Sequence, residues 1–461
     1  MRRITVMAVA LALALGSTPS ARAAGPARPA AGRAAGDQAL GGLGAPARER
    51  RGAPSRWPGR AGGEGSEGCG ARAGARGHDP SGWTALADAF MQKARETADS
   101  AYYRRAELAF ERARALDTSD VSAMVGLARV HGARHEFEKS IEWARRALEL
   151  DPKNAGAYGL LGDAALELGD YEAATEHYQQ MLDLRPDISS YSRSAHLLFV
   201  TGDARRAAWL MDRAIKAGAG YAENTAWCRG QLALMHLNTG NLLAAEQVVE
   251  QAMSLTPANY HVLFAQGRVR AARKDYAGAI DSYRRASAIA PQHEVVVALG
   301  QLYVVTGDRV SADRQWAVVE TIDKLNKANG VTGDLQLARF LADLDRQLPE
   351  ALSIAQAEYK RRPNVFAADT LAWAYYKNGR YGDAKRAIAK ALAQHTPDAS
   401  FLFHAGMIHA RLGDRVSAQR YLAQALSLNP SFNPIDAPIA AATLADLGAQ
   451  ATDALHEAPR P

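Results

Sequence analysis

The residues with the clearest potential for chemistry are few and far apart. His131 and His135 stand four residues apart, a spacing that places both rings on one face of a helix and can hold a metal ion. The pattern offers no third ligand, and the order His-Glu-x-x-His is absent. The two cysteines, Cys69 and Cys228, could pair in an oxidising compartment, but nothing in their context indicates a bond. We therefore expect no metal site and leave the pairing of the cysteines open.

Motifs of catalysis are also lacking. No Gly-x-Ser-x-Gly turn, phosphate-binding loop or dinucleotide-binding fingerprint follows a strand pattern and opens a helix. No segment outside the repetitive part and the N-terminal region is long enough to hold a catalytic domain. The sequence predicts a binding protein with no catalytic residue and no cofactor.

A 34-residue unit governs the chain from about residue 83, and residues 155–188 show it most plainly. Four residues share one face of a first helix: Tyr158, Leu161, Gly162 and Ala165. Gly169 and Asp170 end that helix, since Gly is a poor helix former and a good C-terminal cap. A second helix follows with three residues on one face: Ala174, Tyr178 and Met181. Pro186 ends it, because proline cannot continue the hydrogen-bond ladder.

This helix-turn-helix arrangement resembles the tetratricopeptide repeat, whose signature has an aromatic residue, Leu-Gly, Tyr, Ala, Phe and Pro in this order. Ten copies in phase begin near residues 87, 121, 155, 188, 226, 260, 293, 332, 365 and 399. The resemblance implies an all-α fold, a right-handed superhelical α-solenoid of about ten helix-turn-helix repeats over residues 83–432. In such a solenoid the first helix of every repeat lines the concave side. Residues 433–461 are expected to form a C-terminal capping helix and a tail.

Two insertions interrupt the regular spacing of the repeats. Residues 218–225 add several positions before the fifth first helix, and the second helix of the seventh repeat continues through Leu325. Asn329 and Gly330 are expected to end that longer helix. These insertions predict local changes in the superhelix.

The N-terminus has the three parts of a secretory signal peptide in residues 1–23. Arg2 and Arg3 precede a short apolar stretch, and small residues lead to an Ala-x-Ala-like site that ends at Ala23. A membrane anchor is the alternative, but twelve apolar residues are too few to span a bilayer comfortably. We expect cleavage near this site, no transmembrane segment afterwards, and an exported protein in the periplasm or outside the cell.

Residues 24–82 predict a disordered linker. Gly, Ala, Arg and Pro supply most of its positions, so it cannot bury enough apolar surface to offset the entropy of ordering. Its nine arginines outnumber five acidic residues, whereas the chain after residue 82 has almost equal numbers of basic and acidic side chains. A flexible spacer and a basic tether are both consistent with this composition. No nucleic acid is expected to bind the repeats themselves.

Helical geometry places certain positions of each first helix on the concave side, where they would face a ligand. These candidate binding residues are Phe199, Trp227, Phe264, Arg268, Phe340, Phe366, Asp369, Trp373, Tyr376 and Phe403. Aromatic residues dominate the energetics of interfaces, and a contiguous exposed apolar surface marks a binding groove. The alternative is that some rings fold back onto the neighbouring helix and only pack there. The Lys and Asn pair with which some relatives clamp a C-terminal carboxylate is absent.

Two functions follow from these observations. The first is a non-enzymatic scaffold in the cell envelope that binds a protein or peptide partner, as a helix or extended peptide, in an apolar, aromatic-lined concave groove. The second is a tether in which the basic linker binds envelope polymer, anionic lipid or nucleic acid while the repeats act as a spacer. The sequence does not indicate the oligomeric state.

Overall fold

A computed structural model describes residues 79–219, 222–331 and 335–456. Within these ranges the chain forms 21 helices, α3 to α23, and no strands. The first helices of ten successive hairpins are α3 (Pro80–Thr97), α5 (Val121–Ala133), α7 (Ala155–Glu167), α9 (Ile188–Val200), α11 (Ala222–Asn238), α13 (Tyr260–Ala272), α15 (His293–Val305), α17 (Leu335–Asp343), α19 (Val365–Lys377) and α21 (Ala399–Arg411).

Each first helix is followed by a second helix that packs antiparallel against it. These are α4 (Ala101–Leu116), α6 (Phe137–Leu150), α8 (Tyr171–Leu184), α10 (Ala204–Ala217), α12 (Leu242–Leu255), α14 (Tyr276–Ile289), α16 (Arg309–Ala328), α18 (Leu348–Arg361), α20 (Tyr381–Ala391) and α22 (Arg415–Leu428). The helix α23 (Asp436–His456) follows the tenth hairpin and packs on α22. The prediction of an all-α solenoid of about ten helix-turn-helix repeats is confirmed.

The beginning of the first repeat differs from the prediction. The carboxylate of Asp79 accepts a hydrogen bond from the backbone N–H of Ser81, and Pro80 occupies the first helical turn. A capping acid followed by proline is a strong start signal for a helix. The expected linker boundary at residue 82 is therefore wrong, because residues 80–82 belong to α3. The predicted signal peptide and the rest of the predicted linker lie outside the described residues.

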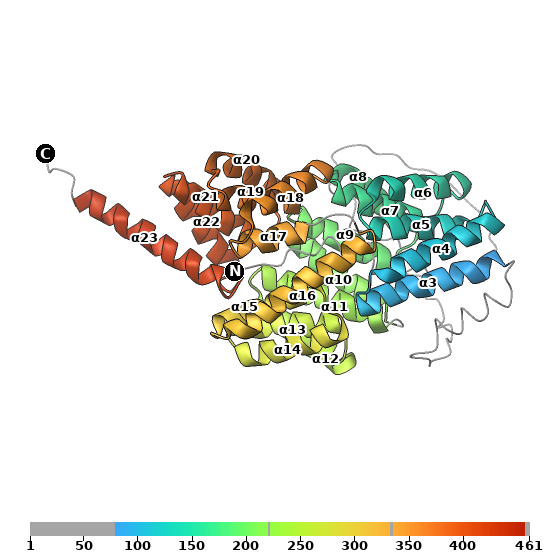
Figure 1. Ribbon diagram of the computed structural model, residues 1–461, viewed down its shortest axis with the longest axis horizontal. Helices are drawn as coiled ribbons and strands as arrows, with labels where there is room; N and C mark the ends of the chain where they lie inside the picture. The colour runs from blue at the N-terminus through green and yellow to red at the C-terminus, as the bar shows by residue number, and fades with distance from the viewer. Residues whose placement is uncertain (1–78, 220–221, 332–334, 457–461) are drawn as a thin grey trace, which may run out of the picture.

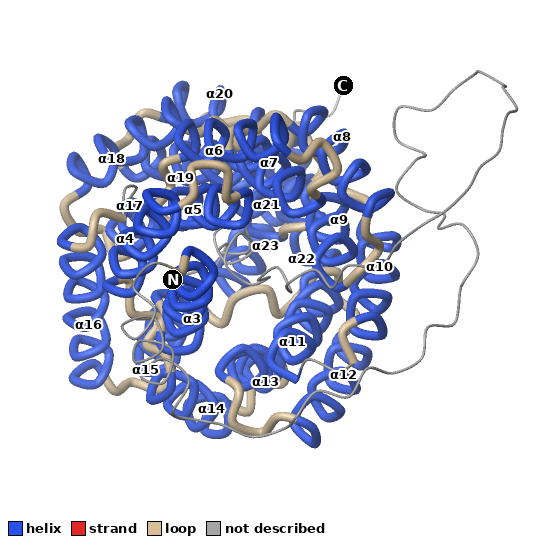
Figure 2. The backbone as a smooth tube through the Cα atoms, turned by 90° about the vertical axis from the view of Figure 1, so that its right-hand side faces the viewer, coloured by secondary structure: helices blue, strands red, loops and turns tan. Residues whose placement is uncertain are grey.

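First and second helices bury different amounts of their surface. Every residue of α9 is buried, whereas α8 buries only one stripe, formed by Ala174, Tyr178 and Met181. Figure 2 shows the reason: the first helices form the inner wall of the superhelix, and the second helices form its outer layer. A helix surrounded on all sides carries apolar or small residues all round, while a surface helix is amphipathic.

The superhelix makes more than one turn, and its second turn lies directly on its first (Figures 1 and 2). Side chains or backbone of repeats 2–5 meet the loops that follow repeats 7–10. Four hydrogen bonds mark this inter-turn seam: Arg134 Nε to Gly330 O at 3.1 Å, Asn364 Nδ2 to Glu167 O at 2.8 Å, Thr396 Oγ1 to Val200 O at 2.5 Å, and Asn429 Nδ2 to Leu237 O at 2.9 Å. Each joins residues 192 to 197 positions apart in the chain. The contacting repeats are thus offset by five. For example, the turn of repeat 3 contacts the loop that follows repeat 8.

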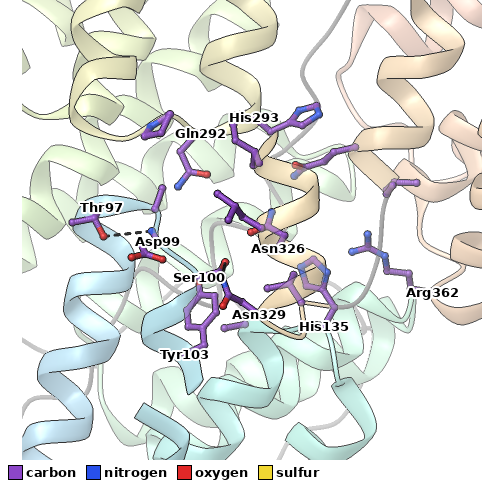
Figure 3. A pocket seen from close by; sticks show the side chains of 18 residues that line it. Thr97, Asp99, Ser100, Tyr103, His135, Gln292, His293, Asn326, Asn329 and Arg362 are labelled. Carbon is purple, nitrogen blue, oxygen red and sulfur yellow. Dashed lines mark hydrogen bonds between the residues drawn. The ribbon is translucent and has the colours of Figure 1, made fainter. Parts of the chain in front are cut away.

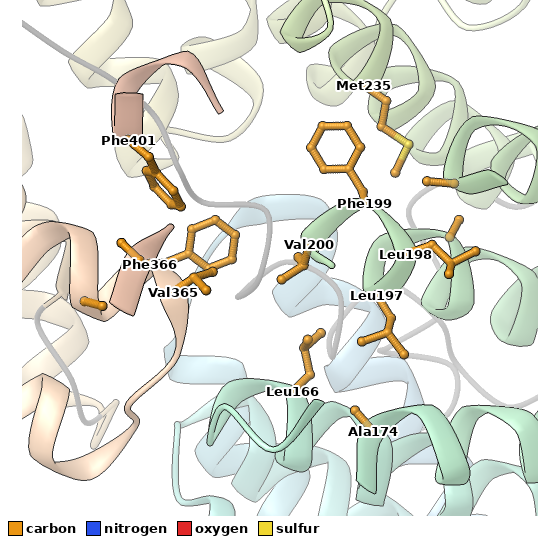
Figure 4. Close-up of a cluster of buried hydrophobic side chains, with 14 of the residues drawn as sticks. Leu166, Ala174, Leu197, Leu198, Phe199, Val200, Met235, Val365, Phe366 and Phe401 are labelled. Atoms are coloured by element: carbon orange, nitrogen blue, oxygen red, sulfur yellow. The ribbon is translucent and has the colours of Figure 1, made fainter. Parts of the chain in front are cut away.

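Apolar side chains close the same seam from within. Leu166 and Val200 of the first turn belong to one buried cluster with Val365, Phe366 and Phe401 of the second turn (Figure 4). Burial of such side chains contributes about 1.5–3 kcal/mol each, so the seam stabilises the stacked form of the superhelix.

The predicted extension in the seventh repeat is confirmed. The helix α16 has 20 residues, whereas α14 and α18, its neighbouring second helices, have 14 each. Asn329 caps its C-terminus, and Gly330 follows with a positive φ of 74°. The amide of Asn329 donates to Ser100 Oγ at 3.0 Å, so the added turns reach back to the first repeat.

Candidate functional site

The predicted concave residues do lie on first helices, but most of them are not accessible. Eight of the ten are buried: Phe199, Trp227, Phe264, Phe340, Phe366, Asp369, Trp373 and Phe403. Only Arg268 and Tyr376 are partly exposed. The prediction that these residues form an exposed aromatic groove is therefore wrong for the eight. Whether any of the ten binds a partner stays a prediction.

The rings are buried because they pack against the first helix of the next repeat. Trp373 stacks on Tyr376 with ring centroids 4.6 Å apart and on His404 of α21 with centroids 4.2 Å apart. Phe366 meets Phe401 edge to face at 5.9 Å, and Trp227 contacts His261 in the same way. Aromatic pairs of this kind add to the free energy of burial, so these rings stabilise contacts between repeats. Arg268 lies with Nη2 3.5 Å from the carbonyl oxygen of Phe432 across the seam.

A buried network of charged groups joins the first helices of repeats 8–10, and the sequence prediction found only one of its members, Asp369. His404 Nδ1 lies 2.7 Å from Asp369 Oδ1, and Arg339 Nη1 donates to Asp369 Oδ2 at 2.5 Å. The other ring nitrogen of His404 lies 2.9 Å from Arg339 Nη2, and Arg339 Nε donates to Asp343 at 3.2 Å. Arg339 occupies the eighth position of its repeat, where the second repeat has Ala128 and the third has Gly162. An arginine at a position that holds a small residue in other repeats was therefore the sign of this network in the sequence.

The electrostatics of this network favour a structural role. Burial lowers the pKa of His404 to about 4 even though Asp369 opposes the shift. Burial by itself raises the pKa of Asp369, but His404 and Arg339 outweigh it and hold that pKa below its ordinary value. At neutral pH the arrangement is thus a neutral imidazole between a carboxylate and a guanidinium, with both ring nitrogens of His404 hydrogen-bonded. No hydroxyl or thiol nucleophile is among the residues of this network.

The two histidines at metal-ligand spacing have separate surroundings. His131 Nδ1 lies 2.6 Å from Glu136 Oε2, whereas the ring of His135 stacks on Phe137. Among the described residues no group of three or more His, Cys, Asp or Glu side chains is placed to hold a metal ion. Cys228 is buried in α11, and burial raises the pKa of its thiol, whereas Cys69 lies outside the described residues.

A cavity of about 300 Å³ interrupts the seam where the first repeat meets the long helix α16 (Figure 3). Its wall combines the turn after α3, the turn after α5, the start of α15, the end of α16, the start of α17 and Arg362. The polar lining residues are Thr97, Asp99, Ser100, His135, Gln292, His293, Asn326, Asn329, Gln336 and Arg362. Its apolar wall includes Ile322, Leu325, Val331 and Leu335. The volume is at the lower end of the range of ligand pockets.

Arg362 and His293 bring no unbalanced positive charge to the cavity, and Asp99 adds a carboxylate to its wall. Arg362 donates to Glu358 at 3.0 Å and to Glu167 at 3.2 Å, so its charge is balanced by neighbouring carboxylates. Burial lowers the pKa of His293 to about 4, which leaves the imidazole neutral at pH 7. The Nε2 atom of His293 is buried without a hydrogen-bond partner among the described residues. A buried polar atom of this kind costs free energy until a ligand or water bonds to it.

The cavity could not be located from the sequence. The extension of α16 was visible at Leu325, but the repeats that it joins lie more than 200 residues apart. Only the stacking of the second superhelical turn on the first brings Asn329 to Ser100.

Comparisons with known proteins agree with this architecture. A tetratricopeptide repeat family model matches residues 91–155, 127–189, 231–294 and 370–431. The chain belongs to the tetratricopeptide repeat family. No helix that the structure describes combines the length and apolar character needed to cross a membrane.

Among relatives, this tetratricopeptide repeat chain is similar to the human protein O-mannosyl-transferase TMTC1, with 26% identity over 196 residues. The similarity covers 41% of this chain and 22% of the human protein, so the chain spans about a fifth of that relative. Among solved structures, PilF of Pseudomonas aeruginosa matches at 19% identity and a TM-score of 0.37, covering 49% of this chain and 98% of that one. YrrB, described as a tetratricopeptide repeat protein with an unusual peptide-binding site, matches at 20% identity and a TM-score of 0.28, covering 40% and 94%.

Proposed function

We propose that this tetratricopeptide repeat protein is an interaction scaffold that holds a short, uncharged peptide segment of its partner in the cavity of the seam. The cavity is the observation that carries the proposal. It joins four repeats, and it gathers polar and apolar groups in one place while the concave aromatic residues are buried.

The chemistry of the lining fits a peptide. Four side-chain amides, those of Gln292, Asn326, Asn329 and Gln336, line the cavity. An amide both donates and accepts hydrogen bonds, which matches the alternating N–H and C=O groups of a peptide backbone. The neighbouring apolar wall offers a place for one apolar side chain. The paired state of Arg362, the neutral His293 and the carboxylate of Asp99 disfavour an anionic segment.

We also propose a location for this function, on the basis of the N-terminal sequence. The pattern of residues 1–23 supports export, so we place the scaffold in the periplasm or outside the cell. The basic composition of residues 24–82 supports a second role, a tether to an acidic envelope component. Deleting residues 24–78 would remove binding through the tether and leave the cavity intact.

Peptide binding is tested with a phage-displayed library of random heptapeptides selected on the protein. Leu325 lines the cavity and is 57% exposed, so Leu325→Glu places a charge at its mouth with little effect on folding. Leu243 on α12 is 63% exposed and lies away from the cavity, so Leu243→Glu is the matched control. We expect selected peptides to bind the Leu325 variant at least about tenfold more weakly than wild type and the control equally well. No enrichment, or equal affinity for both variants, would contradict the proposal.

A further inference from the structure

The inter-turn seam covers one edge of the first superhelical turn very closely. A Cβ atom built at Gly169 would lie 2.8 Å from the carbonyl oxygen of Pro363, and one at Gly202 would lie 3.0 Å from that of Gln394. A Cβ at Gly240 would be closer still to the carbonyl oxygen of Leu428. The turns of repeats 3–5 thus contact the backbone of the second turn without room for a side chain.

The corresponding edge of the second turn is open over its glycines, and among the described residues α23 contacts it only at its last turn, that of repeat 10, where Arg415 donates to Leu447 O at 3.0 Å. Gly307, Gly379 and Gly413 occupy the same place in repeats 7, 9 and 10, and no described atom lies within 4 Å of a Cβ built on any of them. The free turn edge consists of residues 306–309, 344–347, 377–380 and 411–415. It faces the end of the molecule toward which α23 projects (Figure 1). The fold therefore repeats, at its C-terminal end, a surface that is an interface inside the molecule.

The first turn presents the complementary edge at the opposite end. Its outer loop edge consists of residues 116–120, 149–154 and 183–187, the loops that follow repeats 1–3. Leu150 and Leu184 end α6 and α8 and are 52% and 38% exposed. Leu428 ends α22 in the same way, and its carbonyl oxygen covers Gly240 inside the seam. Two exposed leucines therefore stand at the helix end that corresponds to Leu428 in the internal interface.

A capping residue strengthens this correspondence. Asn364 caps α19 by accepting from Ala367 N at 2.9 Å, and its Nδ2 crosses the seam to Glu167 O. Asn154 caps α7 in the same geometry, accepting from Ala157 N at 3.0 Å, and it lies on the outer loop edge. Asn154 on the outer loop edge thus corresponds to Asn364, which donates across the internal seam.

The two edges carry opposite charge. The free turn edge has six basic and three acidic side chains, whereas the outer loop edge has six acidic and two basic ones. Opposite charge at two complementary surfaces accelerates and orients their association.

We propose that the protein associates head to tail with a second copy of itself, with the free turn edge of one copy contacting the outer loop edge of the next. Inside the molecule the turns of repeats 2–5 meet the loops that follow repeats 7–10, an offset of five repeats. If α23 counts as the eleventh unit of the stack, the first three repeats of a second copy continue the stack as units 12–14. Their loops then meet the turns of repeats 7–9. The contact joins two different surfaces, so it forms short linear chains of molecules rather than a closed dimer.

Charge reversal at matched positions tests this arrangement. In the proposed register Arg346 faces the loop of Glu149, and Arg380 faces the loop of Asp183. The turn variant is Arg346→Glu with Arg380→Glu, and the loop variant is Glu149→Lys with Asp183→Lys. Each variant alone brings like charges together, whereas an equal mixture of the two restores opposite charges at every contact. Sedimentation velocity of the full chain without residues 1–23 at low salt measures the association.

We expect the average mass of the wild type to rise with concentration and to fall with added salt. Each variant alone should associate at least about tenfold more weakly, and the equal mixture should return to the wild-type behaviour. Rescue of association by the mixture would exclude misfolding of either variant. Arg145→Glu with Arg284→Glu, at exposed positions in the middle of α6 and α14, makes the same charge change away from both edges and should behave as wild type. A wild type that stays monomeric at all concentrations, or variants that match it, would overturn the proposal.

Discussion

Single residues decide how closely the two turns of the superhelix can approach. Gly240 and Gly413 occupy equivalent places, with φ of 77° and 76°, and both need the conformational freedom of glycine. Only Gly240 also lies under a backbone carbonyl, that of Leu428, whereas the space over Gly413 is open among the described residues. Gly240 therefore serves both the turn of its own repeat and the contact between the two superhelical turns. Gly413 serves only the turn of its own repeat.

This difference predicts unequal effects of one substitution. Gly413→Ala should lower the free energy of unfolding by about 1 kcal/mol, because alanine is strained at positive φ. Gly240→Ala adds a steric conflict with the Leu428 carbonyl and should cost roughly 2–4 kcal/mol, because a closely packed contact must move apart. Urea unfolding of both variants followed by the helical circular dichroism signal provides the measurement. Equal losses at the two positions would show that the seam is not formed in solution.

At the scale of elements, the loops that begin first helices serve both the helix and the seam. Asn364 stabilises α19 through its cap and joins the second turn to the first through Glu167 O. Asn154 has the same capping role in α7, and its Nδ2 stays within its own loop by donating to Asp151 at 3.1 Å. The two asparagines therefore separate the contribution of capping from that of stacking.

Replacing these asparagines measures the seam directly. Asn154→Ala should cost about 1 kcal/mol, the usual value for a lost N-cap. Asn364→Ala should cost about 1–3 kcal/mol more, because the carbonyl of Glu167 loses its partner in a buried place. Hydrogen exchange of the α7–α8 turn adds a local readout and should increase only in the Asn364 variant. Identical exchange of that turn in the two variants would mean that the Asn364 side chain does not hold the two turns together.

For the whole molecule, the sequence predicted the structure within each hairpin and missed the contacts between residues far apart in the chain. The 34-residue spacing located the ten hairpins because each hairpin is specified by its own apolar stripe, turn and cap. The seam joins residues almost 200 positions apart, and no periodic feature near Glu167 indicates that Asn364 will lie against it. Without the seam, Phe366 and Trp373 were expected in an open groove, but they are buried between repeats and turns.

The buried interior also fixes how the whole molecule responds to acid. Burial lowers the pKa of His196 to about 4, that of His261 to about 3 and that of His293 to about 4. Burial acts in the opposite direction on an acid, raising the pKa of Glu294 to about 7. Between pH 6.5 and 4 the unfolded chain binds protons on these three histidines that the folded protein does not bind. The folded protein keeps a proton on Glu294 that the unfolded chain loses above about pH 4.5.

The histidine contribution dominates, so stability should fall as the pH falls from about 6 to 5. With His404, whose pKa burial also lowers to about 4, four protons are taken up on unfolding and one is released. The net uptake of about three protons corresponds to roughly 3–4 kcal/mol of unfolding free energy per pH unit. Urea unfolding at fixed steps between pH 7 and 5 gives this slope. Glu294→Gln removes the opposing group, so its slope should be steeper than that of the wild type by about 1.4 kcal/mol per pH unit. A wild-type stability that is flat or rises on acidification would show that these buried imidazoles are open to water in solution.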